Sequence, residues 1–152
     1  MKISTLHNHL VGAWTGTMTL YTNWLPVKEH PSESHLVVAP AAGGNFLCFS
    51  YSWSYEDEPK EGLLLLGNEN DADSVTASWI DSWHQNGKIL QLTGDANDGL
   101  IKVHGTFPAP PDPDWGWRIE VSVDDGAPRI AMFVISPKGE EDPAVDTKYR
   151  RA

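Results

Sequence analysis

The chain has 152 residues, a length that suits one domain built around a single hydrophobic core. Hydrophobic residues make up 40% of it and charged residues 21%, proportions that exclude a disordered chain. The formal net charge of −10 would repel phosphate backbones and anionic lipid headgroups, so we expect neither a nucleic-acid nor a membrane partner.

Cysteine usage and the N-terminal sequence bear on the cellular compartment. Cys48 is the only cysteine, so no internal disulfide can form, which fits a reducing environment. The first residues contain no apolar run of the length that a signal peptide requires, and no stretch approaches the ~20 apolar residues that span a bilayer. These observations predict a cytoplasmic protein.

The first predicted element is a short helix at about 4–10. Ser4 is its expected N-cap, and Leu6 and Leu10 share one face of it. No longer window keeps helical periodicity, so this is the one helix that the sequence predicts.

The rest of the chain predicts strands joined by tight turns. Turn-forming pairs such as Asn86-Gly87 recur at near-regular spacing and tolerate the positive φ angles that hairpins need. The runs between the turns predict ten strands, near 11–21, 34–40, 45–55, 61–67, 74–84, 88–94, 99–107, 115–123, 128–136 and 143–150. Segments 22–33 and 108–114 contain proline, which cannot donate to a strand ladder, so we expect them to be loops.

Several of these runs alternate with period two, which is typical of a sheet with two different faces. In 45–55, one face is apolar and carries Leu47, Phe49, Tyr51, Trp53 and Tyr55. In 74–84, Trp79 and Asp81 share a face, and an unbroken strand would place His84 on the opposite one.

This pattern predicts an all-β fold with one domain spanning residues 1–152. Ten short strands in sequence could form either a sandwich or a closed meander. Closure removes the exposed edges of a flat sheet, so we favour an antiparallel up-and-down barrel of about eight to ten strands. A barrel of this size is either filled by side chains or holds one small ligand.

Four segments carry a resemblance to a known family. They are Gly12-Ala13-Trp14, Trp79-Ile80-Asp81-Ser82-Trp83-His84, Trp115-Gly116-Trp117-Arg118-Ile119, and Ser136-Pro137-Lys138-Gly139-Glu140-Glu141 followed by Tyr149-Arg150. The first is similar to the Gly-x-Trp of the calycin superfamily, which includes lipocalins and fatty-acid-binding proteins. Together they resemble a bacterial family of calycin-like barrels, domain of unknown function 1579. The resemblance implies a barrel with a short N-terminal helix near one end, which Trp14 closes, and it implies no catalytic mechanism.

A carboxylate between two indoles is the first candidate for a ligand site. If Trp79 and Asp81 face the interior, burial would raise the pKa of the carboxyl unless donors or a cation keep it ionised. Arg118 and Arg150 are the candidate counter-ions, because arginine pairs bidentately with carboxylates. In that arrangement Asp81 orients a ligand, whereas the alternatives are a structural Asp–Arg pair or a strand-end Asp bonded to the backbone.

The other candidate ligand-binding residues are Trp53, Trp117, His84 and Arg118. The tryptophans, with Trp79, either stack on a flat apolar ligand or fill the barrel completely. Arg118 lies opposite Trp117 in the strand pattern, so it is an inward anion receptor only if a bulge re-aims it, and otherwise a surface charge.

The sequence predicts no metal and no cofactor. A zinc site usually needs three or four ligands, and no cluster of histidines, cysteines and carboxylates supplies them. The nucleophile motif Gly-x-Ser-x-Gly is absent, and Cys48 lies in an apolar strand without a cationic neighbour in sequence. The sequence therefore predicts ligand-binding residues but no catalytic residues.

Three functions remain open at this point. We favour a non-enzymatic protein that binds a small hydrophobic or aromatic, possibly anionic, molecule inside the barrel. The first alternative is an isomerase or hydrolase with Asp81 and His84 as acid and base, which requires a bulge to bring them to one side. The second is an interaction module that uses exposed aromatics such as Trp24 and Tyr55, and the sequence leaves open whether the protein is a monomer or a homodimer.

Overall fold

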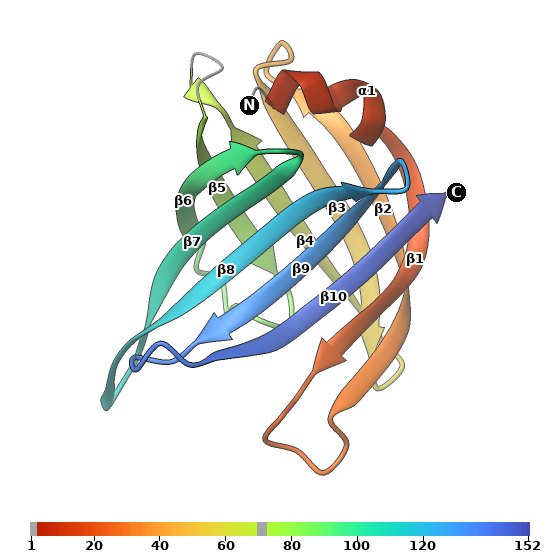
Figure 1. The fold of residues 1–152 in the computed structure, drawn as a ribbon. Helices are drawn as coiled ribbons and strands as arrows, with labels where there is room; N and C mark the ends of the chain where they lie inside the picture. Colours follow the sequence, from red (N-terminus) through yellow and green to blue (C-terminus); the bar gives the residue numbers. More distant parts are fainter. Residues whose placement is uncertain (1–2, 70–72) are drawn as a thin grey trace.

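The computed structural model describes residues 3–69 and 73–152. Two short helical turns precede ten strands (Figure 1). In chain order these elements are η1 (Ile3–Leu6), α1 (His7–Leu10), β1 (Gly12–Tyr21), β2 (Glu29–Ala41), β3 (Phe46–Tyr55), β4 (Glu58–Gly67), β5 (Ser74–Asp81), β6 (Leu90–Asn97), β7 (Leu100–Ala109), β8 (Asp112–Asp124), β9 (Ala127–Ile135) and β10 (Glu141–Arg151).

The strands form one closed barrel in which each strand pairs with its sequence neighbours and all pairs are antiparallel. The barrel closes where β1 pairs with β10, from Trp14–Arg151 to Leu20–Val145. Closure gives every strand a partner on both sides along part of its length, so no strand has a wholly unpaired edge. The predicted all-β antiparallel barrel with a short N-terminal helix is confirmed, and the strand number is ten.

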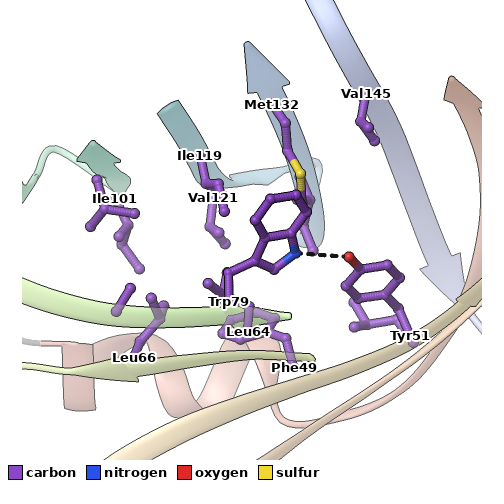
Figure 2. Close-up of a cluster of buried hydrophobic side chains, with 14 of the residues drawn as sticks. Phe49, Tyr51, Leu64, Leu66, Trp79, Ile101, Ile119, Val121, Met132 and Val145 are labelled. Carbon is purple, nitrogen blue, oxygen red and sulfur yellow. Dashed lines mark hydrogen bonds between the residues drawn. The ribbon is translucent and has the colours of Figure 1, made fainter. Parts of the chain in front are cut away.

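The barrel interior is filled by the alternate residues of each strand. In β3, for example, Leu47, Phe49, Tyr51 and Trp53 are buried, and the residues between them face outwards. Figure 2 shows how side chains from β3, β4, β5, β7, β8, β9 and β10 converge on this core. The hydrophobic effect of burying these faces is the main force that closes the sheet.

Trp14 closes the end of the barrel next to α1. Its side chain is 2% exposed, and its Nε1 donates a hydrogen bond of 2.8 Å to the carbonyl of Leu10, the last residue of α1. The Arg151 guanidinium covers the indole, 4.0 Å from the ring centroid. The helix, the first strand and the last strand are therefore joined at one point, and η1 begins at Ile3, so Ser4 lies within the helical turns and not at an N-cap.

Both proline-containing segments contain strand residues, contrary to prediction. In 22–33, β2 already begins at Glu29, and Pro31 pairs with Thr19 of β1. Pairing of β2 with β3 starts only at His35, so Pro31 lies where β2 has one neighbour and its missing N–H removes no bond on the β3 side. In 108–114, only Pro110 and Pro111 form the turn between β7 and β8.

Strand β5 ends at Asp81, three residues before the predicted end at 84. A turn follows, so the alternation of a strand no longer applies to His84. The carboxyl end of β5 lies at the barrel end opposite α1 (Figure 1). We call this end the mouth, and the connection 82–89 between β5 and β6 lies there.

No helix among the residues that the structure describes is long and apolar enough to cross a membrane.

Candidate functional site

The turn after β5 is built on the Asp81 side chain. Oδ1 of Asp81 accepts hydrogen bonds from the backbone N–H groups of Trp83, at 2.9 Å, and His84, at 3.2 Å. The Asp81 carbonyl accepts a further bond of 3.1 Å from the N–H of Gln85. An aspartate that bonds to the amides two and three residues later favours a turn over a continued strand. The turn brings His84 back over the carboxylate, so the expectation that Asp81 and His84 face opposite sides was wrong.

The second carboxylate oxygen holds two inward side chains of β3. The hydroxyl of Tyr51 donates to Oδ2 of Asp81 at 2.7 Å, and Nε1 of Trp53 donates to the same atom at 3.2 Å. The Tyr51 oxygen in turn accepts a bond of 2.9 Å from Nε1 of Trp79, as the dashed line in Figure 2 shows. One buried carboxylate therefore sets the positions of three aromatic rings.

Gly62 makes the contact between Tyr51 and Asp81 possible. It lies between them across the sheet, because Tyr51 pairs with Gly62 and Gly62 pairs with Asp81. A Cβ at position 62 would lie 2.2 Å from both Cζ and Oη of Tyr51. The tyrosine ring thus occupies the space above the glycine backbone to reach the carboxylate one strand further on.

His84 lies among four tryptophans. Its ring centroid is 4.8 Å from that of Trp83, 5.3 Å from those of Trp79 and Trp117, and 5.9 Å from that of Trp53. Trp79 and Trp117 stack on each other, with centroids 5.1 Å apart and ring planes inclined by 12°. We call Asp81, His84 and these four tryptophans the mouth cluster.

The imidazole also contacts the carboxylate. Nδ1 of His84 is 3.1 Å from Oδ1 of Asp81, and the side chains of both residues are nearly buried, with exposed fractions of 10% and 1%. The contact does not have the geometry of a well-formed hydrogen bond, so the attraction between the two groups is mainly electrostatic.

These contacts determine the charge of Asp81. Burial alone would raise the pKa of the Asp81 carboxyl, but His84, the Tyr51 hydroxyl and the Trp83 amide together lower it below its ordinary value. Burial and the neighbouring Asp81 charge both raise the pKa of the Tyr51 hydroxyl well above its ordinary value, so Tyr51 stays a donor. The buried carboxylate is ionised at neutral pH.

A hollow of about 260 Å³ opens beside the mouth cluster. Pairing between β6 and β7 ends at Thr93–His104, and the hollow lies beyond that point, between the start of β6 and the end of β7. Rings of the mouth cluster, the 82–89 connection, β6 and β7 line it. The lining residues are Trp79, His84, Gln85, Asn86, Lys88, Ile89, Leu90, Thr106, Phe107, Pro108 and Trp117.

Besides Nδ1 of His84, which faces Asp81, two buried polar atoms in this lining have no hydrogen-bonding partner among the described residues, namely Nε1 of Trp117 and Oε1 of Gln85. The Gln85 amide is oriented by its nitrogen, which donates to the carbonyls of Trp79, at 2.7 Å, and Lys88, at 3.2 Å. Buried polar groups without a partner are rare in folded proteins and mark places where a ligand or water belongs.

A second, more open hollow of about 810 Å³ lies against the outer faces of β2 to β5 and the same connection. Its lining includes the outward side chains of Val37, Leu63 and Ile80. Gln85, Lys88 and Ile89 line both hollows, so the 82–89 connection separates them.

The structure brings five of the six predicted ligand-binding residues together: Trp53, Trp79, Asp81, His84 and Trp117. It does not bring Arg118 to them. Arg118 lies on the outer face, where it pairs with Glu120 and Glu141 and covers the Phe133 ring at 4.4 Å. Arg150 is also exposed, so neither arginine is the counter-ion of Asp81.

Residues that sequence reasoning missed include Tyr51, Gly62 and Gln85. The alternation of 45–55 already placed Tyr51 on the same face as Trp53, and this signal could have identified it. Nothing in the sequence marked Gly62 or Gln85, because their roles depend on neighbouring strands and on the turn after β5. Of the two aromatics named for the alternative interaction module, Trp24 is 69% exposed, and Tyr55 packs against Trp83 with ring centroids 5.5 Å apart.

In residues 3–69 and 73–152 no group of three or more histidine, cysteine, aspartate or glutamate side chains could hold a metal ion.

Fold and site define a ten-stranded barrel protein with a polar and aromatic cluster at one mouth. The chain belongs to the protein family of unknown function DUF1579, whose model matches residues 5–151. It is also similar to the crystal structure of Rv2717c from M. tuberculosis, with a TM-score of 0.65 over 97% of this chain and 96% of that one. The two sequences are 12% identical, so this likeness concerns the fold alone. No curated protein matches the chain.

We predict that Gly62→Ala lowers the free energy of unfolding by about 1–3 kcal/mol, the usual cost of overpacking a core. The reason is the steric conflict with the Tyr51 ring. In a Tyr51→Ala background the same substitution should leave the free energy of unfolding unchanged or raise it slightly. The reason is that alanine lowers the conformational entropy of the unfolded chain relative to glycine. Urea unfolding of the four proteins of this cycle measures the coupling, and an equal cost in both backgrounds would contradict it.

We predict a loss of stability in acid that depends on Asp81. Because the folded-state pKa of this carboxyl lies below its unfolded value, its contribution is complete above the unfolded pKa of about 3.9 and is lost as the pH falls through the folded value. Asp81→Asn should therefore lower stability at pH 7 by about 1.5–3 kcal/mol and lower it less at pH 3. Denaturant unfolding at both pH values tests this. Asp57→Asn, in an exposed turn, serves as the control.

Proposed function

We propose that the protein binds a small aromatic molecule of one or two rings, neutral or anionic, in the hollow beside the mouth cluster. The lining of this hollow carries the proposal: aromatic and aliphatic side chains surround a few polar groups, the usual make-up of a small-molecule site. Trp79, Trp117 and Phe107 supply the apolar surface, and His84 and Gln85 supply polar atoms.

The size of the hollow supports a ligand of this kind. A dry cavity of about 150 Å³ accommodates benzene, so 260 Å³ has room for a second fused ring or a ring substituent. The hollow is smaller than the ~300–1,000 Å³ of sites for drug-sized ligands, which argues against long-chain lipids.

The charge of the lining supports an anionic ligand. The chain has a formal net charge of −10, yet no aspartate or glutamate lines the hollow. Lys88 at the rim makes no ion pair with any described residue and is free to meet a ligand carboxylate.

The calycin-like relationship and the cytoplasmic location are part of the same proposal. Trp14 of the Gly-x-Trp segment plugs the barrel end next to α1, the position that the calycin resemblance implies for it. The ligand then enters from the opposite end. Cys48 is a free thiol, as is usual in a reducing compartment.

Binding of 2-naphthoate, followed by two-dimensional ¹H–¹⁵N NMR, tests the proposal. We expect the indole N–H signals of Trp79 and Trp117 to shift. Thr106→Trp, which places a large ring at the opening, should weaken binding at least tenfold. Thr93→Trp, on the outer face of β6 outside the hollow, should not. Lys88→Met should weaken 2-naphthoate by roughly two- to fivefold, the range of an exposed ion pair, and leave neutral 2-naphthol unaffected. Tight binding by Thr106→Trp would refute the location.

The contact between Asp81 and His84 favours a second candidate function, hydrolysis. A carboxylate that holds an imidazole is the arrangement used to orient a general base. In this reaction, His84 takes a proton from a water that attacks an ester carbonyl. The C–O bond to the aromatic alcohol then breaks, and the proton passes from the imidazolium to the leaving oxygen. Asp81 positions the ring.

Hydrolysis of 2-naphthyl acetate to 2-naphthol and acetate tests this candidate, because the alcohol portion fits the hollow. General-base catalysis contributes about 10²–10⁴-fold, so His84→Phe should reduce turnover at least a hundredfold. His35→Phe, at an exposed histidine, controls for surface imidazoles. If the wild-type protein hydrolyses the ester no faster than His84→Phe does, the hydrolase candidate is wrong and the binding proposal is unaffected.

A further inference from the structure

The two ring nitrogens of His84 lie in different surroundings. Nδ1 is fully buried and lies 3.1 Å from Oδ1 of Asp81. Nε2 is neither sealed from solvent nor bonded to any residue that the structure describes, and His84 lines the hollow. One nitrogen therefore faces a negative charge, and the other is open to a ligand.

The buried carboxylate determines which nitrogen carries the proton of the neutral imidazole. A lone pair on Nδ1 would be repelled by the Asp81 oxygen at 3.1 Å, whereas an N–H there is attracted to it. The hydroxyl of Tyr51, the indole N–H of Trp53 and two backbone amides all donate to the carboxylate and favour its ionised form. Free histidine prefers the proton on Nε2, so Asp81 imposes the less common tautomer.

With the proton on Nδ1, Nε2 is a hydrogen-bond acceptor. The rings packed around it cannot satisfy it: the Nε1 atoms of Trp53 and Trp79 already donate to Asp81 and Tyr51. The indole N–H of Trp117 makes no hydrogen bond to any described residue, and so none to Nε2 of His84. The acceptor is therefore available only to a molecule in the hollow.

We infer that the ligand carries a hydrogen-bond donor on its aromatic ring, a phenolic hydroxyl or a ring N–H, which bonds to Nε2 of His84. This inference rests on the proposed function and specifies its ligand class as hydroxyaromatic or N–H heteroaromatic molecules. An aryl ether of the same shape would leave Nε2 unpaired in a nearly buried position, and such a loss weakens binding strongly. Asp81 acts here as a positioning residue, through the tautomer of His84.

The tautomer is measured without any ligand. In protein with ¹⁵N-labelled histidine, at a pH at which the imidazole is neutral, the ring nitrogen shifts of His84 should show a protonated Nδ1 and an unprotonated Nε2. Asp81→Asn should raise the fraction protonated on Nε2, whereas His35, exposed at the barrel surface, should show the ordinary tautomer in both proteins. A protonated Nε2 in the wild-type protein overturns the inference.

The donor preference is measured with a matched pair of ligands, 2-naphthol and 2-methoxynaphthalene. We expect the wild-type protein to bind 2-naphthol about tenfold more tightly, the effect of one hydrogen bond to a nearly buried acceptor. His84→Phe keeps an aromatic ring and should reduce the ratio to about one, while His35→Phe should keep it near ten. His84→Gln, which restores an acceptor, should recover part of the preference.

The outcomes separate the inference from the proposed function. If both naphthalenes bind equally well to the wild-type protein, the donor preference is wrong and the binding function stands. If neither they nor 2-naphthoate bind, both are wrong. A tenfold preference that persists in His84→Phe also overturns the inference, because another group would then be the acceptor.

Discussion

The buried carboxylate of Asp81 is the interaction on which the mouth of this barrel depends. It ends β5, bonds to the amides that form the following turn, and holds a tyrosine and a tryptophan of β3. Taking a charge out of water is costly unless donors surround it, and here both oxygens are bonded. Since two donors belong to β3 and two to the turn after β5, the carboxylate joins these two parts of the barrel into one unit.

The same interaction explains why aromatic rings so dominate this end of the barrel. Tryptophan and tyrosine combine large apolar surfaces with a single donor, so they can fill the interior and still satisfy a central anion. Because Gly62 has no side chain, the Tyr51 ring can lie over it and reach Asp81. Asp81, Tyr51 and Trp53 thus could not be exchanged one by one without leaving a buried polar atom with fewer partners.

Binding and catalysis would use the same pair of residues in this site. The carboxylate fixes the imidazole, and the hollow presents the imidazole to a molecule that enters between β6 and β7. In the binding function, Nε2 of His84 accepts a hydrogen bond from the ligand. In the hydrolase function, it accepts a proton from a water molecule that attacks an ester. The exterior is acidic, whereas the described lining of the hollow has no carboxylate and includes Lys88, so an anion would gain most by entering there.

The sequence by itself determined the all-β class, because period-two alternation and regular turn signals act locally and point to strands whatever their partners. It favoured a barrel over a sandwich, and the pairing of β1 with β10 decided between them. It also placed Trp53, Trp79 and Trp117 each on one face of an alternating run, without deciding which face points inward. Only the tertiary structure decided that Asp81 ends its strand and turns His84 inward, and that Arg118 stays outside. The reason is that these outcomes depend on neighbours from other strands: donors from β3 for the carboxylate, and acidic partners on β8 and β10 for the arginine.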